Sequence, residues 1–262
     1  MSKSENTTGG STLQTVSRAM AVLRCFSGGD RTLSLAELTK LMDLNKVTVF
    51  RLATTLVTEG VLAFDKEASR YRVSYGLIAL GRKLLDGDGL RDTAHAFMEK
   101  ARLQTRETIC LSVREQWDQV VVHAMPSPQP VRYVLEVASR GPVYNGAAGQ
   151  CLIAKMSETE LNKLVSETGL VPTSDNSVTS IEPLTTKLTS ICKDGYAISH
   201  GERISGAAAT AAPIYDGEGN IIASLSIIMP KTRATGTHLT NCIRVVQETA
   251  GTISGELKSS TK

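Results

Sequence analysis

Hydrophobic and polar positions follow a helical period between Ser34 and Gly60, and they predict two short helices joined by a turn. Ser34 and Glu37 have the S-x-x-E spacing of a capping box, which starts the first helix. Asn45 is a suitable N-cap for the second helix, and Gly60 tolerates the positive φ with which many helices end. The apolar positions of the second helix form one stripe, so one face of this helix is expected to pack on a core. These positions are Val49, Leu52, Ala53, Leu56 and Val57.

The opposite face of this second helix carries cations and hydroxyls, and it has no acidic residue before Glu59. In a helix-turn-helix the second helix enters the major groove of DNA, and its N-terminal residues contact base edges. An ordinary solvated helical hairpin shows the same pattern, so this stretch alone leaves both interpretations open. The sequence that follows it favours DNA binding.

After Gly60 the pattern changes to two short strands, Val61–Phe64 and Arg70–Val73, around a charged turn. We interpret this pair as a wing whose cations contact phosphates, the alternative being an ordinary surface hairpin. The helix face and the wing together give the predicted DNA-binding residues: Lys46, Val47, Thr48, Phe50, Arg51, Thr54, Thr55, Lys66, Arg70 and Arg72.

The rest of the chain predicts a linker helix and a larger domain. The linker helix spans Ser74–Leu85 and ends at the breaker Asp86–Gly89, and its leucine ridge is expected to pack on a partner subunit. In the larger domain the expected strands are Thr108–Val113, Val120–Ala124, Val131–Val137, Ala207–Ile214 and Ile221–Met229. The expected helices are Leu90–Glu107, Gln150–Met156, one opened by a capping box of Ser157 and Glu160, Pro183–Lys193 and one that contains Leu239–Leu257.

These elements predict an α+β fold with an antiparallel sheet. We expect a winged helix-turn-helix domain over residues 13–73, a linker helix over 74–89 and a sheet domain with helices over 90–258. Charge follows the same division, because residues 1–85 hold 12 Lys and Arg against 7 Asp and Glu, while the remainder holds 17 against 19. This asymmetry agrees with a polyanionic partner for the first part.

Composition excludes several classes of protein. No apolar run approaches the roughly 20 residues that a membrane span needs, and the polar N-terminal arm lacks the apolar core of a signal peptide. The five cysteines are odd in number and widely scattered, which argues against a disulfide framework or a zinc site. We therefore expect a protein of the reducing cytoplasm without a membrane partner.

An enzyme acting on a small organic acid is the main competing class, and a sensing module that does not bind DNA is another. The sequence contains no P-loop, G-x-S-x-G, H-E-x-x-H or G-x-G-x-x-G motif. An S-x-x-K match at Ser190–Lys193 lies inside a predicted helix and lacks its partner motifs. The four histidines show no metal-ligand spacing, and only a pairing of His200 with Glu202 merits attention. We expect no catalytic residue, no metal and no cofactor.

The order of these parts resembles the IclR family of bacterial transcriptional regulators, from about Leu13 to Leu257. The segments that carry the resemblance are LQTVSRAMAVLRCF, SLAELTKLMDLNKVTVFRLATTLVTEGVL, YRVSYGLIALG, GPVYNGAAGQCLIA and GYAISHGERISGAAATAAPIYDGEGNIIASLSI. The resemblance implies a winged helix-turn-helix, a linker helix and a GAF-like effector-binding domain. It also implies homodimers, often paired into tetramers, that bind palindromic operators in double-stranded DNA near catabolic genes.

The resemblance further implies an effector pocket between the loop before the first inner helix and the facing strands. On this chain its expected residues are Tyr133, Tyr144, Asn145, Gly146, Ala147, Ala148, Ser199, Glu202, Ala209, Ser226 and Ile228. The chain departs from the family pattern at Ser199 or His200, where an acid is common, and at Ala209, where cysteine or serine is common. These departures predict few charged groups and an apolar wall framed by Tyr133, Tyr144, Ile228 and Met229, although plain core packing is the alternative role of each tyrosine. Such a pocket suits an aromatic or carboxylate metabolite.

The combined prediction is a sequence-specific DNA-binding repressor of a catabolic operon, controlled by a small organic effector. Effector binding is expected to change the separation of two recognition helices in a dimer, which must lie roughly 34 Å apart to reach successive turns of the major groove.

Overall fold

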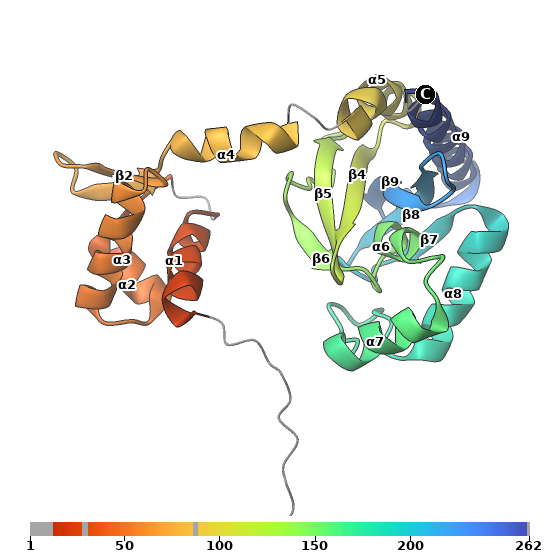
Figure 1. Cartoon of the computed structure of the whole chain (residues 1–262). Helices are drawn as coiled ribbons and strands as arrows, with labels where there is room; N and C mark the ends of the chain where they lie inside the picture. Colours follow the sequence, from red (N-terminus) through yellow and green to blue (C-terminus); the bar gives the residue numbers. More distant parts are fainter. Residues whose placement is uncertain (1–12, 28–30, 86–88, 261–262) are drawn as a thin grey trace, which may run out of the picture. The chain divides into compact units, whose positions relative to one another are not determined.

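The computed structural model describes residues 13–27, 31–85 and 89–260 of the 262-residue chain. It divides into two compact units, Met1–Gly87 and Asp88–Lys262, each with a hydrophobic core of its own (Figure 1). The linker helix belongs to the first unit, while the domain bounds expected at residues 73 and 89 stay predictions. The polar arm and the breaker at residues 86–88 lie outside the described residues.

The first unit begins with helices α1 (Gln14–Arg24), α2 (Leu35–Met42) and α3 (Lys46–Thr58), and a short 3-10 turn η1 (Cys25–Ser27) follows α1. Both predicted helix starts are confirmed. The Ser34 side chain and the Glu37 carboxylate cap each other's backbone N–H groups, and the Asn45 side chain accepts a hydrogen bond from the Thr48 N–H at 2.8 Å. The stripe of α3 packs on α1 and α2 in one small core: Val22, Leu38, Val49, Leu52, Ala53 and Leu56.

A three-stranded antiparallel sheet completes the winged helix-turn-helix. Strands β2 (Leu62–Asp65) and β3 (Arg70–Val73) form the predicted hairpin, and β1 (Thr32–Ser34) pairs with the other edge of β3. The sequence pattern missed β1 because three residues are too few to show a period of two. The linker helix α4 (Gly76–Leu85) follows, with Ile78 and Leu80 exposed.

The second unit is built on a six-stranded antiparallel sheet in the order β6-β5-β4-β9-β8-β7 (Figure 1). Its strands are β4 (Thr108–Glu115), β5 (Asp118–Met125), β6 (Arg140–Pro142), β7 (Ala197–His200), β8 (Ala207–Tyr215) and β9 (Ile221–Pro230). The central strands β4, β8 and β9 match the predicted ones within two residues at each end. The edge strands β6 and β7 were not predicted, since both are short; β6 contains Gly141, and β7 closely follows Gly195.

The two faces of this sheet are covered differently. Helices α5 (Gly89–Thr105) and α9 (Gly236–Ser260) lie side by side on one face, against a main core that includes Leu111, Leu225 and Ile227. The other face meets α6 (Ala147–Leu152), which packs with α7 (Glu158–Thr168) and α8 (Ile181–Asp194) in a second core. Because side chains alternate along a strand, Cys110 and Ser226 point to this second face. No described helix is long and apolar enough to cross a membrane.

The predicted strand Val131–Val137 is wrong. This segment forms no ladder, and its valines Val131, Val134 and Val137 are exposed. Side chains of neighbouring elements hold its backbone instead: the Thr108 hydroxyl donates to the Tyr133 carbonyl at 2.6 Å, and Arg233 donates to the Val131 carbonyl at 2.9 Å. The alternation of apolar and polar residues here reflects a loop that turns one side towards the sheet, and it does not indicate a paired strand.

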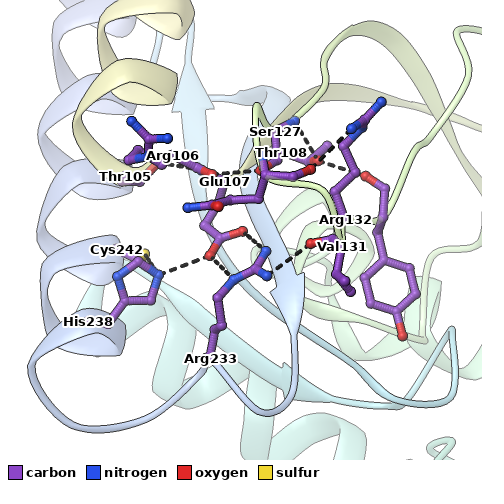
Figure 2. Close-up of polar contacts among 12 residues, drawn as sticks. Thr105, Arg106, Glu107, Thr108, Ser127, Val131, Arg132, Arg233, His238 and Cys242 are labelled. Atoms are coloured by element: carbon purple, nitrogen blue, oxygen red, sulfur yellow. Dashed lines mark hydrogen bonds and ion pairs between the residues drawn. The ribbon is translucent and has the colours of Figure 1, made fainter.

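Arg233 belongs to a buried ionic group that we call the Glu107 cluster, consisting of Glu107, Arg233 and His238 (Figure 2). The Arg233 Nε and Nη2 atoms donate to the two oxygens of Glu107 at 2.7 and 2.6 Å, and His238 Nε2 lies 3.1 Å from Oε1. The Cys242 sulfur lies 3.8 Å from the same histidine nitrogen, and burial raises the pKa of its thiol to about 12. The cluster fastens the start of β4 to the turn between β9 and α9.

Candidate functional site

The outward face of α3 is exposed in the described part of the first unit. Val47 and Phe50 are 69% and 49% exposed although both are apolar. Arg51 and Lys46 are exposed, and within the described residues neither side chain has a hydrogen-bond or ion-pair partner. The remaining predicted residues of this face are also accessible: Thr48, Thr54 and Thr55. The face therefore offers cations, hydroxyls and apolar atoms, which is the mixture that a base-reading helix uses.

The wing cations differ in their engagement. Arg70 donates to the Thr32 hydroxyl and carbonyl and forms an ion pair with Glu37 at 2.8 Å, so it fastens β1 and α2 to the wing. Arg72 lies over the Tyr75 ring at 5.7 Å, and Lys66 is exposed in the turn between β2 and β3. Lys66 and Arg72 are therefore the wing cations available to phosphates, whereas the Arg70 guanidinium is already in use.

A cavity lies on the second face of the large sheet, beneath α6. Its empty volume is about 480 Å³ with the open mouth included. Eight of the predicted effector residues line it: Gly146, Ala147, Ala148, Ser199, Glu202, Ala209, Ser226 and Ile228. They come from the start of α6, strands β7 to β9 and the β7–β8 turn, which the fold brings together from distant parts of the sequence.

Three predicted effector residues are outside this lining and have structural partners instead. The Tyr144 side chain is buried in the second core, and its hydroxyl donates to the Val171 carbonyl at 3.0 Å. The Asn145 side chain accepts from the Val178 N–H at 2.9 Å. Tyr133 packs beside the cavity and donates to the Ser205 carbonyl at 3.1 Å. Met229 points to the opposite face, into the main core. The aromatic frame expected from the sequence is thus replaced by smaller side chains.

Glu202 lines the cavity with a fully engaged carboxylate. One oxygen accepts from the Gly146 N–H at 3.2 Å and from Gln150 Nε2 at 2.7 Å, and the other accepts from Lys187 Nζ at 2.7 Å. Its predicted partner His200 is exposed at the end of β7. Glu202 therefore fastens the β7–β8 turn to α6 and α8.

Sequence reasoning missed three polar residues of the lining, namely Ser112, Gln119 and Arg203. Arg203 follows Glu202 and is half-buried, and burial lowers the pKa of its guanidinium. Gln119 is 1% exposed, and its amide donates to the Asn145 carbonyl at 3.2 Å. The predicted strand began at Val120, one residue after Gln119, so Gln119 was left outside the strand and its inward direction was not recognised. Arg203 lies in an irregular turn, where no periodicity indicates a side-chain direction.

The rest of the lining is neutral. Burial raises the pKa of the Cys110 thiol to about 12, so it acts as a small apolar group. Leu135 and Ile228 add aliphatic surface, and Ser112 and Ser226 add hydroxyls. Among the described residues no group of three or more His, Cys, Asp or Glu side chains could hold a metal ion. The arrangement is that of a binding cavity for a small organic molecule.

Comparison with known proteins agrees with both units. Residues 15–66 match the profile of the IclR helix-turn-helix domain, and residues 82–255 match that of the bacterial transcriptional regulator IclR C-terminal domain. The HTH-type transcriptional regulator KdgR of Escherichia coli is 27% identical over 230 residues, which covers 88% of each chain.

Solved structures show the same fold. The structure of an IclR transcriptional regulator from Alicyclobacillus acidocaldarius is similar with a TM-score of 0.78 and 26% identity, covering 94% of this chain and 100% of that one. An IclR homologue from Microbacterium hydrocarbonoxydans, complexed with 4-hydroxybenzoate, gives a TM-score of 0.79 and 24% identity over 94% and 100% of the two chains. Because the C-terminal profile alone covers more than half of the sequence, the chain belongs to the IclR family of bacterial transcriptional regulators, which are DNA-binding proteins and not enzymes.

Proposed function

We propose that this regulator acts in the bacterial cytoplasm as a homodimer, or a pair of dimers, on a palindromic operator in double-stranded DNA. It represses a catabolic operon until a small organic effector binds in the cavity of the second unit. The observation that carries the proposal is the outward face of α3, where the side chains of Arg51 and Lys46 have no partner among the described residues. A helix of a helix-turn-helix with such a face is suited to the major groove.

The two kinds of cation have different proposed roles. Arg51, with Val47 and Thr48, reads base edges from α3, because an arginine fork matches guanine and a methyl-bearing side chain matches thymine. Lys66 and Arg72 contact phosphates from the wing, which fixes the position of the protein and carries no sequence information. Arg70 is left out of the proposed interface because its guanidinium already binds Thr32 and Glu37.

The effector and the operator are proposed to act on one equilibrium between two states of the dimer. The cavity supports an effector with an apolar body and a few polar groups, and a relative of the same fold is known in complex with 4-hydroxybenzoate. If the effector favours the state that binds the operator poorly, then the operator must weaken effector binding by the same factor.

The test compares Arg51→Ala with Lys66→Ala on a site selected from a random DNA pool by the wild-type protein. Arg51→Ala should lower affinity for this site by about 5- to 100-fold and lower its preference over unrelated DNA, as expected for a base contact. Lys66→Ala should weaken binding to both DNAs alike and reduce the slope of log affinity against log salt by about 1.

Lys100→Ala serves as the charge-matched control, because Lys100 is an exposed lysine of α5 in the second unit. It should change neither the affinity nor the preference. An Arg51→Ala protein with an unchanged preference would show that α3 does not read the operator. A wild-type protein that prefers no DNA sequence would favour the sensing module that works without DNA.

A further inference from the structure

Two neighbouring residues bring opposite charges to the cavity, and only one of these charges is neutralised. Glu202 is 5% exposed, and its carboxylate accepts from Gly146, Gln150 and Lys187. The ion pair with Lys187, at 2.7 Å, cancels its charge. The hydrogen bonds leave little capacity for a ligand, so Glu202 neither attracts a cation strongly nor repels an anion strongly.

The Arg203 guanidinium has no such partner. Its Nη2 atom donates to the Arg140 carbonyl at 3.0 Å, and no carboxylate of the described residues lies within 4.0 Å of it. The nearby acid Asp118 is paired with the Arg140 side chain at 3.1 Å. A guanidinium has five N–H donors, so most of those on Arg203 remain available. A half-buried cation without a counter-charge is costly, and an anionic ligand would remove that cost.

A glycine in β6 leaves space for this guanidinium close to the backbone. A Cβ atom added to Gly141 would lie 2.6 Å from the Arg203 Nε atom, so a side chain at this position of β6 would displace the guanidinium. Gly146 has φ +84°, and a Cβ added there would lie 3.5 Å from the Arg203 Cβ. Gly141 therefore allows the Arg203 guanidinium to lie close against the backbone of β6, whereas the 3.5 Å distance at Gly146 is an ordinary contact.

A second polar group of the lining lacks a partner independently of Arg203. The Gln119 side chain is buried, its nitrogen donates to the Asn145 carbonyl, and its Oε1 atom has no hydrogen-bond partner among the described residues. Buried carbonyl oxygens of this kind are rarely left unsatisfied. Since Gln119 lines the cavity, a donor group on a bound molecule is the partner that would satisfy this oxygen.

We propose that Arg203 and Gln119 determine the specificity of this cavity: the Arg203 guanidinium binds the carboxylate of an acidic effector, and the Gln119 Oε1 atom accepts from a hydroxyl or N–H group of the same molecule. This inference rests on the proposed role of the cavity as the effector site. The cavity is also lined by aliphatic and small side chains, among them Leu135 and Ile228, which receive a compact apolar body. Arg203 selects the acid by its charge, and Gln119 selects a hydroxylated acid over one without a donor.

The first experiment measures binding of matched probes to the full-length protein by calorimetry. The probes are 4-hydroxybenzoate, 3-hydroxybenzoate, mandelate and lactate, each beside its neutral amide, together with benzoate and inorganic phosphate. At least one hydroxy acid should bind 10-fold or more tightly than its amide, and benzoate should bind more weakly than its hydroxylated forms. Binding of amides as tight as that of acids, or no binding of any acid at 10 mM, would overturn the inference. Binding of phosphate alone would assign Arg203 to inorganic anions and would also overturn it.

The second experiment repeats the titration with substituted proteins. Arg203→Met should weaken the hydroxy acid by about 10- to 100-fold, which is the usual effect of removing a hydrogen bond to a charged group. Arg203→Lys should retain part of the affinity, because it keeps the charge and loses the planar fork. Gln119→Leu should reduce the preference for hydroxylated acids over benzoate. Arg244→Met is the matched control: its side chain binds Glu248 and Asn241 on α9, which covers the opposite face of the sheet, so acid affinity should not change.

Operator binding without any acid separates this inference from the proposed function. If Arg203→Met binds the operator like the wild type and has lost the acid, both proposals are supported. Undiminished acid binding by Arg203→Met overturns the role of Arg203 and leaves the DNA-binding function intact. A wild-type protein that binds acids through Arg203 but prefers no DNA overturns the proposed function and leaves the acid site standing.

Discussion

Two arginines of the second unit illustrate two ways of placing a guanidinium in a protein interior. Arg233 donates two parallel hydrogen bonds to Glu107 and a third to the Val131 carbonyl, so its donors face fixed protein acceptors (Figure 2). Arg203 donates one hydrogen bond to the Arg140 carbonyl, has no carboxylate partner among the described residues and lines the cavity. We call the Arg233 arrangement a closed polar group, because its hydrogen bonds are made to protein acceptors, and the Arg203 arrangement an open one, because most of its donors have no protein acceptor among the described residues.

The difference separates stability from binding. A closed group contributes to stability through bonds that unfolding would break, and it has nothing left for a ligand. An open group adds little to the stability of the folded state, because part of it has no hydrogen-bond partner. A ligand that supplies this partner removes the free-energy penalty, which increases the affinity for the ligand. The same division runs through the buried amides, because Gln150 has two acceptors for its nitrogen whereas Gln119 keeps one oxygen without a donor.

The largest expected effect is on the closed arginine. Arg233→Ala removes both bonds to Glu107, whose carboxylate is 2% exposed, and leaves its charge with His238 alone. Loss of one partner of a buried ion pair costs about 3–5 kcal/mol, and we expect about 3 kcal/mol because Arg233 is 28% exposed. Urea unfolding followed by the fluorescence of the single tryptophan, Trp117 in the second unit, measures it.

The open arginine is the control for that measurement. Arg203→Met should change the free energy of unfolding by less than about 1 kcal/mol without ligand, since it breaks one bond to a carbonyl and removes an uncompensated charge. If Arg203→Met destabilised the unit as much as Arg233→Ala, the distinction between closed and open groups would fail.

The amides offer a smaller test of the same distinction. Gln150→Leu removes donors from the Tyr144 carbonyl and from Glu202, and unsatisfied buried acceptors of this kind cost about 1–3 kcal/mol. Gln119→Leu should cost at most about 1 kcal/mol, because it removes an unpartnered oxygen along with the bond to the Asn145 carbonyl. Both variants are compared by the urea midpoint of the tryptophan signal, and the reverse order would contradict the assignment.

The sequence predicted well those features that depend on contacts between residues close together in the chain. Capping boxes at Ser34 and Ser157 were recognised because their two partners lie three residues apart, and both form as expected. The strands β8 and β9 were recognised because a strong turn, Asp216–Asn220, separates two continuous apolar runs. By contrast, the alternation of Val131–Val137 suggested a strand where side chains from β4 and the β9–α9 turn hold a loop.

It was harder to predict which charged side chains of the cavity remain available to a ligand, because this depends on contacts between distant segments. Whether Glu202 is available to a ligand depends on Lys187 in α8, and the sequence shows no sign of that pairing. Arg203 comes next in the chain, yet the position of its guanidinium depends on Gly141, which lies about sixty residues earlier. The resemblance gave the correct loop and strands for the cavity, but it did not identify the residue that carries its free charge.

The smallest expected effect concerns a closed pair that a change of pH should disrupt. His95 Nδ1 on α5 lies 3.0 Å from His123 Nε2 on β5, so one proton joins the two rings. Burial, and then the charges of Arg91 and His95, lower the pKa of His123. Because its folded pKa lies below the unfolded value of about 6.5, neutral His123 stabilises the fold above that value, and this contribution is lost as the pH falls from about 6.5 towards the folded pKa.

The free energy of unfolding of the wild type should therefore drop between pH 7.5 and 5.5. His123→Gln should lose less stability over the same interval. His200→Gln, at the exposed end of β7, should lose as much as the wild type. An equal loss in the wild type and in His123→Gln would show that other groups, and not the histidine pair, set the pH dependence.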